Sequence, residues 1–135
     1  MASKLSLQQI LQELYDESAN ALRVRIGVIA TPAVQLEWDG ATQSLDLSQS
    51  SVYVIDLSAT AVTTLTFTNP VDGGRYTLIL DTDSAAAITW PANVMWKGGS
   101  APTLTTEGVD VVTFIYDETN DRFLADVGQA FAVPT

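Results

Sequence analysis

The side chains most often used for catalysis are scarce in this sequence. Its 135 residues include no histidine and no cysteine, which excludes a Ser-His-Asp triad, a Cys-His pair and metal centres ligated by those side chains. No G-x-S-x-G, Walker or G-x-G-x-x-G pattern is present, and "KGGS" at 97–100 is too short for a phosphate loop. Carboxylates are the groups that remain for acid–base chemistry.

Glu37 and Asp39 form one candidate carboxylate pair. They flank Trp38, so on a strand both would lie on one face about 7 Å apart, a separation that glycoside hydrolases use. A catalytic acid also needs an apolar setting that raises its pKa, whereas "EWDGAT" is typical of a strand that enters an exposed turn. A solvated face is the favoured interpretation and a glycosidase the weakest alternative, so we expect no catalytic residues.

Two acidic clusters, "DTDS" at 81–84 and "DETND" at 117–121, could in principle hold a cation. Neither has the twelve-residue spacing of an EF-hand, with its central glycine and terminal glutamate. Acidic residues in turns usually accept hydrogen bonds from nearby backbone N–H groups. We therefore expect no metal site and no cofactor.

Six basic and sixteen acidic residues give the chain a formal net charge of -10. A field of this sign repels DNA, RNA and anionic membrane surfaces, so no nucleic-acid partner is expected. The stretch "LSLQQILQEL" near the N-terminus is interrupted by polar residues, and no apolar run approaches the roughly 20 residues of a membrane span, so no membrane insertion is expected. The composition, 47% hydrophobic and 16% charged, predicts a globular protein that is soluble where it is made.

A short amphipathic helix is predicted at about residues 6 to 19. Ser6 and Gln9 have the spacing of a capping box. A helix this short is marginal alone, so its apolar stripe has to pack on another surface. Two interpretations remain open: packing on the chain's own β domain, or a seam that joins copies or docks on another protein. The predicted anchor or oligomerisation residues are Leu7, Ile10, Leu11 and Leu14.

After the helical segment the hydrophobic period changes to two. Residues 22–28 alternate, and further short runs of this kind follow, separated by Pro, Gly, Asp, Asn or Ser. These runs are VQLEW, QSLDLS, SVYVIDL, VTTLTFT, RYTLIL, AAAITW, VDVVTFIY and RFLADV. The predicted fold class is all-β, with an antiparallel β-sandwich or jelly-roll-like domain at 21–135 preceded by the N-terminal helical segment at 1–20.

Two hairpins and one central strand are predicted within this domain. The turn "NPVDGG" would join residues 62–68 to 75–81, and "DETND" would join the last two strands. In the strand 111–116 both alternating sets are largely apolar, which indicates cover on both faces or a place at a subunit interface. No internal repeat of 20 to 50 residues is apparent.

The stretch "ITWPANVMWKGGSAPTLT" at 88–105 interrupts the strand pattern. Because its prolines cannot donate to a ladder, residues 91 to 102 are expected to leave the sheet as a structured loop. Its two tryptophans either pin this loop over one end of the domain or help to form a surface on which a sugar ring stacks. The tryptophans considered for these roles are Trp38, Trp90 and Trp96.

The same stretch resembles a known family. "ITWPANVMWKGGSAPTLTTEGVDVVTFIYDETNDRF" is similar to a segment that recurs in tail-fibre and related virion proteins of tailed bacteriophages. With the preceding "LTFTNPVDGGRYTLILDTD", the resemblance covers about half of the chain, and "YDESANALRVRI" is similar to lead-in segments of small phage structural proteins. The motif positions are Trp90, Pro91, Trp96, Gly98, Gly99, Pro102, Leu104, Thr105, Gly108, Asp110 and Phe114.

This resemblance implies a non-enzymatic virion protein, a trimeric fibre-type or capsid-decorating β knob that its N-terminal region attaches to the particle. Because only residues 1–20 precede the β body, a short head fibre, decorating spike or small adaptor fits better than a long tail fibre. The implied partners are other copies and other virion proteins of capsid, neck or tail, and the implied location is the virion, after synthesis in the host cytoplasm. The alternative is a carbohydrate-binding receptor adhesin at a fibre tip, which would bind host surface glycans through the tryptophans.

Overall fold

The computed structural model describes residues 15–16, 21–22, 32–37, 42–57, 62–83 and 86–134. The chain divides into two units, residues 1–30 and 31–135. In the first unit the described residues form one antiparallel pair, β1 (Tyr15–Asp16) with β2 (Ala21–Leu22). Among the described residues no helix is long and apolar enough to span a membrane.

Most of the helix predicted at residues 6 to 19 lies outside the described residues. The exceptions are Tyr15 and Asp16, which form β1, so the helix prediction is wrong at these two residues. The predicted anchor residues and most of the first predicted strand also lie outside the described residues: Leu7, Ile10, Leu11, Leu14 and 23–28.

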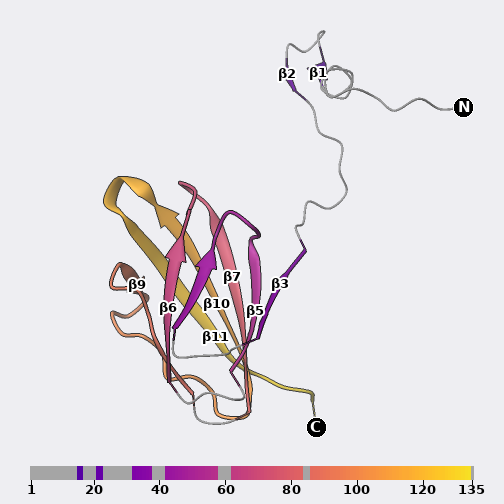
Figure 1. Cartoon of the computed structure of the whole chain (residues 1–135), viewed down its shortest axis with the longest axis vertical. Helices are drawn as coiled ribbons and strands as arrows, with labels where there is room; N and C mark the ends of the chain where they lie inside the picture. The colour runs from indigo at the N-terminus through magenta and orange to yellow at the C-terminus, as the bar shows by residue number, and fades with distance from the viewer. Residues whose placement is uncertain are drawn as a thin grey trace, which may run out of the picture. The chain divides into compact units, whose positions relative to one another are not determined.

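The second unit consists of two β-sheets that share one core (Figure 1). The six-stranded sheet has the order β3-β5-β7-β10-β11-β9, and the three-stranded sheet has the order β4-β6-β8. The larger sheet comprises β3 (Val34–Glu37), β5 (Val52–Asp56), β7 (Arg75–Thr82), β9 (Val94–Trp96), β10 (Gly108–Asp117) and β11 (Arg122–Phe131). The smaller comprises β4 (Thr42–Asp46), β6 (Val62–Thr68) and β8 (Ala87–Thr89). A 3-10 turn, η1 (Glu118–Asn120), connects β10 to β11.

From β3 to β8 the chain passes alternately between the two sheets, as in a β-solenoid. β3, β5 and β7 pair in parallel in the larger sheet, and β4, β6 and β8 pair in parallel in the smaller one. Val34 lies opposite Tyr53, and Tyr53 lies opposite Leu78, so successive coils differ in length. Unequal coils explain why the sequence shows no repeat of fixed period.

The all-β class is confirmed, but the antiparallel sandwich is wrong for β3 to β8. Within the second unit antiparallel pairing joins β7 to β10 and β10 to β11, while β9 adds in parallel at the edge beside β11. Alternation along a strand specifies which side chains face inward, and a one-residue slip would reverse it. It does not specify which strand lies alongside, so the same pattern satisfies the parallel coils.

The first predicted hairpin is wrong and the second is confirmed. The strands at 62–68 and 75–81 fall in β6 and β7, which belong to different sheets. Their connection is held to β10 instead, because the Gly73 N–H donates to the Tyr116 carbonyl at 2.9 Å and the Tyr116 N–H donates to the Gly74 carbonyl at 3.0 Å. β10 and β11 form the second hairpin, and β10 is a central strand, as predicted.

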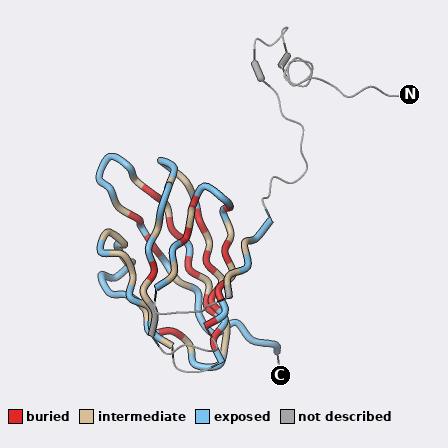
Figure 2. Tube along the Cα trace, in the orientation of Figure 1, coloured by how far each residue is buried: buried red, intermediate tan, exposed pale blue. Residues whose placement is uncertain are grey.

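Buried residues alternate with more exposed ones along β5, β7 and β10 of the larger sheet (Figure 2). An aromatic cluster joins the two layers, because Phe67 comes from β6 in the smaller sheet and the other rings come from the larger. The Phe67 ring stacks on Phe114 with centroids 5.0 Å apart, and Phe114 meets Phe123 edge to face at 5.4 Å. Tyr76 adds a tilted contact with Phe114 at 5.5 Å. Phe114 therefore lies at the centre of the contact between the sheets.

Replacing Phe114 with alanine should lower the free energy of unfolding by about 3 to 5 kcal/mol, because the ring is buried and its removal leaves a cavity among three other rings. Thr66→Ala, an exposed threonine on β6 next to Phe67, is the matched control and should change stability by less than about 0.5 kcal/mol. Urea unfolding followed by circular dichroism measures both values. Equal midpoints for the two variants would contradict the central role of Phe114.

Candidate functional site

The outward side chains of the two sheets differ in chemical character. On the three-stranded sheet the outward side chains of β4 and β6 are mainly hydroxyl-bearing: Thr42, Ser44, Thr64, Thr66 and Thr68. On the six-stranded sheet they are mainly aliphatic, and we define the outer apolar face as Val52, Val54, Thr77, Ile79, Val111, Thr113 and Ile115. A solvated sheet face is normally polar. The smaller sheet follows this rule and the larger sheet does not.

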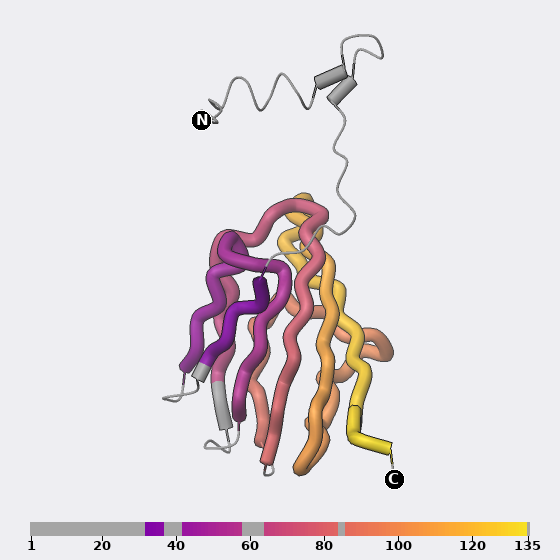
Figure 3. Tube along the Cα trace, turned by 90° about the vertical axis from the view of Figure 1, so that its right-hand side faces the viewer, coloured from indigo at the N-terminus to yellow at the C-terminus, as the bar shows by residue number. Residues whose placement is uncertain are grey.

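Strand register makes the outer apolar face continuous. Val52 lies opposite Thr77, which lies opposite Thr113 on the next strand. Ile79 is flanked in the same way by Val54 and Val111, with the strands side by side in Figure 3. The strand 111–116 is covered on its inner face by the core, and cover of its outer face stays a prediction. The structure shows that β5 and β7 also carry apolar side chains on both faces.

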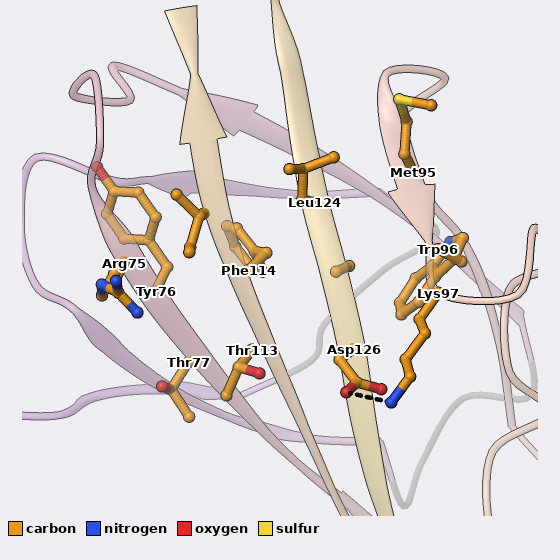
Figure 4. Close-up of a pocket in the computed structure, with 12 residues that line it drawn as sticks. Arg75, Tyr76, Thr77, Met95, Trp96, Lys97, Thr113, Phe114, Leu124 and Asp126 are labelled. Carbon is orange, nitrogen blue, oxygen red and sulfur yellow. Dashed lines mark ion pairs between the residues drawn. The ribbon is translucent and has the colours of Figure 1, made fainter.

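A groove of about 670 Å³ lies at one end of this face, over β7, β10, β11 and β9 (Figure 4). Thr77 and Thr113 contribute hydroxyl groups, and Met95 and Leu124 contribute apolar surface; these two are 51% and 45% exposed. Its charged lining residues are Arg75, Lys97 and Asp126. The groove can therefore accept a partner that is mainly apolar and carries an acidic group.

Arg75 is the basic residue of this groove that is free to bind a partner. The described residues include three basic side chains, and two of them form ion pairs: Lys97 Nζ lies 3.5 Å from Asp126, and Arg122 Nε lies 2.8 Å from Asp117. The Lys97 pair is largely exposed and contributes little stability. Arg75 is exposed and has no ion pair with any described residue.

The two tryptophans in the described part of the motif pack on each other. The ring centroids of Trp90 and Trp96 are 4.9 Å apart at an interplanar angle of 73°, and both half-buried rings pack against the core. This geometry agrees with the loop-pinning interpretation. The sugar-stacking interpretation stays a prediction, and the third tryptophan considered for it, Trp38, lies outside the described residues.

The expectation that residues 91 to 102 leave the sheet is wrong for part of that range. Val94–Trp96 forms β9, which pairs in parallel with β11 at the edge of the six-stranded sheet. An edge strand needs a partner on one side only, so a three-residue strand fits between the two prolines. Gly98 and Gly99 then turn the chain with φ values of 84° and 87°, and the Gly99 N–H donates to the Trp96 carbonyl at 2.8 Å.

The acidic cluster at 117–121 is occupied by structural hydrogen bonds. Asp117 accepts bonds of 2.8 Å from the Asn120 side-chain amide and from Arg122 Nε, which lower the pKa of its carboxyl group. Asp121 accepts a bond from the Tyr116 hydroxyl at 3.2 Å. Across residues 32–37, 42–57, 62–83 and 86–134, no three acidic, histidine or cysteine side chains are grouped to hold a metal ion.

The side chains of the candidate catalytic pair lie outside the part of the chain that the structure describes. Glu37 is the last residue of β3 and only its backbone is described, and Asp39 is not among the described residues.

Asp110 is the organising side chain of the second half of the motif. Its carboxylate is 1% exposed and accepts hydrogen bonds from the backbone N–H groups of Thr105 at 2.7 Å and Ala130 at 3.0 Å. The Thr82 hydroxyl donates to the Thr105 carbonyl at 2.5 Å. Asp110 thereby joins the loop before β10 to the end of β11. A carboxylate at an inward position of the apolar run "GVDVV" is the sequence signal that could have identified it.

No family model, curated protein or solved structure matches this chain. The resemblance to tail-fibre proteins is therefore a likeness of motif residues. In this structure those residues have structural roles: the tryptophan pair fixes the segment around β9, the two glycines turn it, and Asp110 fastens the loop that follows. The outer apolar face and Arg75 have none of these structural roles. Among the described residues, they are therefore the candidates for contact with a partner.

Acid should weaken the fastening by Asp110. Burial raises the pKa of this carboxyl group, but hydrogen bonds from the Thr105 hydroxyl and from the N–H groups of Thr105 and Ala130 outweigh burial and hold the pKa below 3.8. A lowered pKa means that the stabilising contribution is complete above about pH 4, the unfolded value, and is lost as pH falls through the folded pKa.

Asp110→Asn should therefore be less stable than the unchanged protein at pH 7 by about 1 to 3 kcal/mol, and the difference should shrink as pH falls below about 4. Urea midpoints between pH 7 and pH 3 measure it, with the exposed Asp83→Asn as the control for loss of one negative charge. A difference that is independent of pH would contradict the role assigned to the Asp110 carboxylate.

Proposed function

We propose that this chain is a non-enzymatic structural protein of a tailed-bacteriophage particle, a fibre-type or capsid-decorating β knob. It is attached to the particle through its N-terminal region and works as an assembly of copies, with three copies as the resemblance implies. The observation that carries the proposal is the motif from Trp90 to Phe114, which resembles a segment of virion appendage proteins. The structural roles of its residues support this assignment, because a motif that fixes the shape of a knob suits a protein whose function is to present a rigid surface.

The character of the β body also supports the proposal. Its two sheets are joined through a continuous core, and the short η1 connection is held in place because the Glu118 N–H donates to Asp72 in the connection between β6 and β7 at 3.1 Å. A rigid body of this kind withstands exposure outside a cell better than one with long loops. The aliphatic outer face of the larger sheet suits a protein that is covered by neighbours in an assembly.

Particles purified from a phage that encodes this chain should contain it, and deletion of residues 1–20 should remove it from the particles while the β body still folds. The matched variant replaces Leu7, Ile10 and Leu14 with alanine within the full chain and should give the same loss, because these side chains form the predicted anchor. Mass spectrometry of gradient-purified particles measures incorporation. A chain absent from the particles would refute the proposal, and full incorporation of the truncated chain would refute the anchor.

The second candidate is a carbohydrate-binding receptor adhesin, which the groove favours because it combines an aromatic residue, Trp96, with the hydroxyl and charged groups of Thr77, Thr113 and Asp126. A glycan that stacks on Trp96 should shift and enhance tryptophan fluorescence, and Trp96→Ala should abolish binding on a glycan array. Trp90→Phe is the control, since it retains an aromatic ring beside Trp96. Glycan binding that persists in Trp96→Ala would exclude this ring as the platform.

A further inference from the structure

The contrast between the two outer faces indicates that one of them is covered in the working protein. The two sheets enclose the same core, yet the outer face of one carries Thr and Ser where that of the other carries mainly Val and Ile. β-Branched residues of either kind suit a strand, so the requirements of the strand do not explain the difference. Contact with another surface does, because Val and Ile gain free energy when water is removed and hydroxyl groups do not.

The size of the outer apolar face suits a protein contact. The outer apolar face spans three strands, β5, β7 and β10, which at a spacing of about 4.8 Å measure roughly 14 Å across, and the rows from residue 75 to 81 measure about 20 Å. The area is on the order of 300 Å², at the lower end of the range of the largest functional patches on monomers, about 300 to 600 Å². Charged residues at both ends extend it toward the roughly 800 Å² that each partner contributes to a standard interface.

The charges on β7 are arranged so that the face is complementary to itself. Arg75 lies at one end of the strand, in the groove, and Asp81 lies on the same side near the other end, opposite Asp56 of β5. Between them the outward residues are the uncharged Thr77 and Ile79. A partner that covers this face has to bring an acidic group to Arg75 and a basic group to Asp81. A second copy of the chain brings both.

We infer that the outer apolar face is the docking surface for a second copy of this chain, placed so that Arg75 of one copy lies beside Asp81 of the other. Two copies related by a twofold axis through the middle of β7 satisfy this contact. A ring of three copies also satisfies this contact when the strands lie transverse to the threefold axis. In that arrangement the Arg75 end of each sheet meets the Asp81 end of the next sheet.

The uncharged side chains that lie between Arg75 and Asp81 on the outer apolar face explain how an acidic protein can associate with itself. The chain has a net charge of -10, so copies repel each other at a distance. A contact through Val, Ile and Thr side chains buries no like charges, and the Arg75–Asp81 pairs give the contact its direction. The inference deepens the self-assembly in the proposed function but does not depend on attachment to a particle.

Light scattering after size exclusion tests the inference on the full chain in solution. We expect the unchanged protein to be a dimer or trimer of the 14.5 kDa chain at micromolar concentration. Thr113→Arg places a charge in the middle of the face and should weaken association by about 100-fold or more, because the charge cannot be hydrated in the contact. Thr66→Arg is the matched control, an exposed threonine on a strand of the other sheet, and should leave association unchanged.

Charge exchange keeps the test decisive if Thr113→Arg fails to fold. Arg75→Asp and Asp81→Arg should each weaken association by about 10-fold, and the double variant should restore it, because the pair is exchanged in both copies. Circular dichroism melting of each variant confirms that it is folded.

Three results would overturn the inference. The first is an unchanged protein that stays monomeric at tens of micromolar. The second is an assembly that tolerates Thr113→Arg but is lost with residues 1–20, which would assign association to the N-terminal segment. The third is failure of the double charge variant to recover. Each can occur whether or not the chain is found in phage particles, so failure of this inference and failure of the proposed function are distinguishable.

Discussion

An aliphatic sheet face is stable only when it is protected from water, and this constraint governs the whole β body. The inner face of the six-stranded sheet is covered by the three-stranded sheet, through a core that runs from Leu45 and Leu65 on one side to Leu78 and Val112 on the other. The outer face of the smaller sheet is hydroxylated and is stable in water. The outer face of the larger sheet is aliphatic, so the same constraint requires a further layer there, which a second copy would supply.

The motif from Trp90 to Phe114, which resembles a segment of phage appendage proteins, has a structural explanation. Trp90 and Trp96 hold each other and the core, and Asp110 fastens the loop before β10 to the end of β11. A motif of this kind identifies a way of closing the end of a β body. The motif does not determine which partner the β body binds, because binding depends on outward side chains that the motif does not include. Arg75 and the outer apolar face belong to that second set, so they can vary while the closure is kept.

The sequence predicted the positions of individual strands well, but it predicted poorly which strands pair with one another. Alternation located most of the strands of the body, from β3 to β11, and identified β10 as central. It missed β9, because three residues between two prolines give too short a pattern, and it paired residues 62–68 with 75–81 because a glycine-rich turn between two strands is typical of a hairpin. The candidate site was mostly missed. Val52, Val54 and Ile79 lie on separate strands of ordinary composition, and they form one face only when those strands are placed side by side.

The sequence by itself determined the all-β class of the body, the inward set of side chains in most strands, the hairpin at "DETND" and the lack of histidine and cysteine chemistry. These properties depend on residue types and on spacing within a few positions, which are local. The tertiary structure decided that the coils run in parallel, that the two outer faces differ and that Arg75 and Asp81 lie at opposite ends of one apolar surface. Those properties depend on contacts between strands far apart in the chain, and the period of a single strand carries no information about its neighbour.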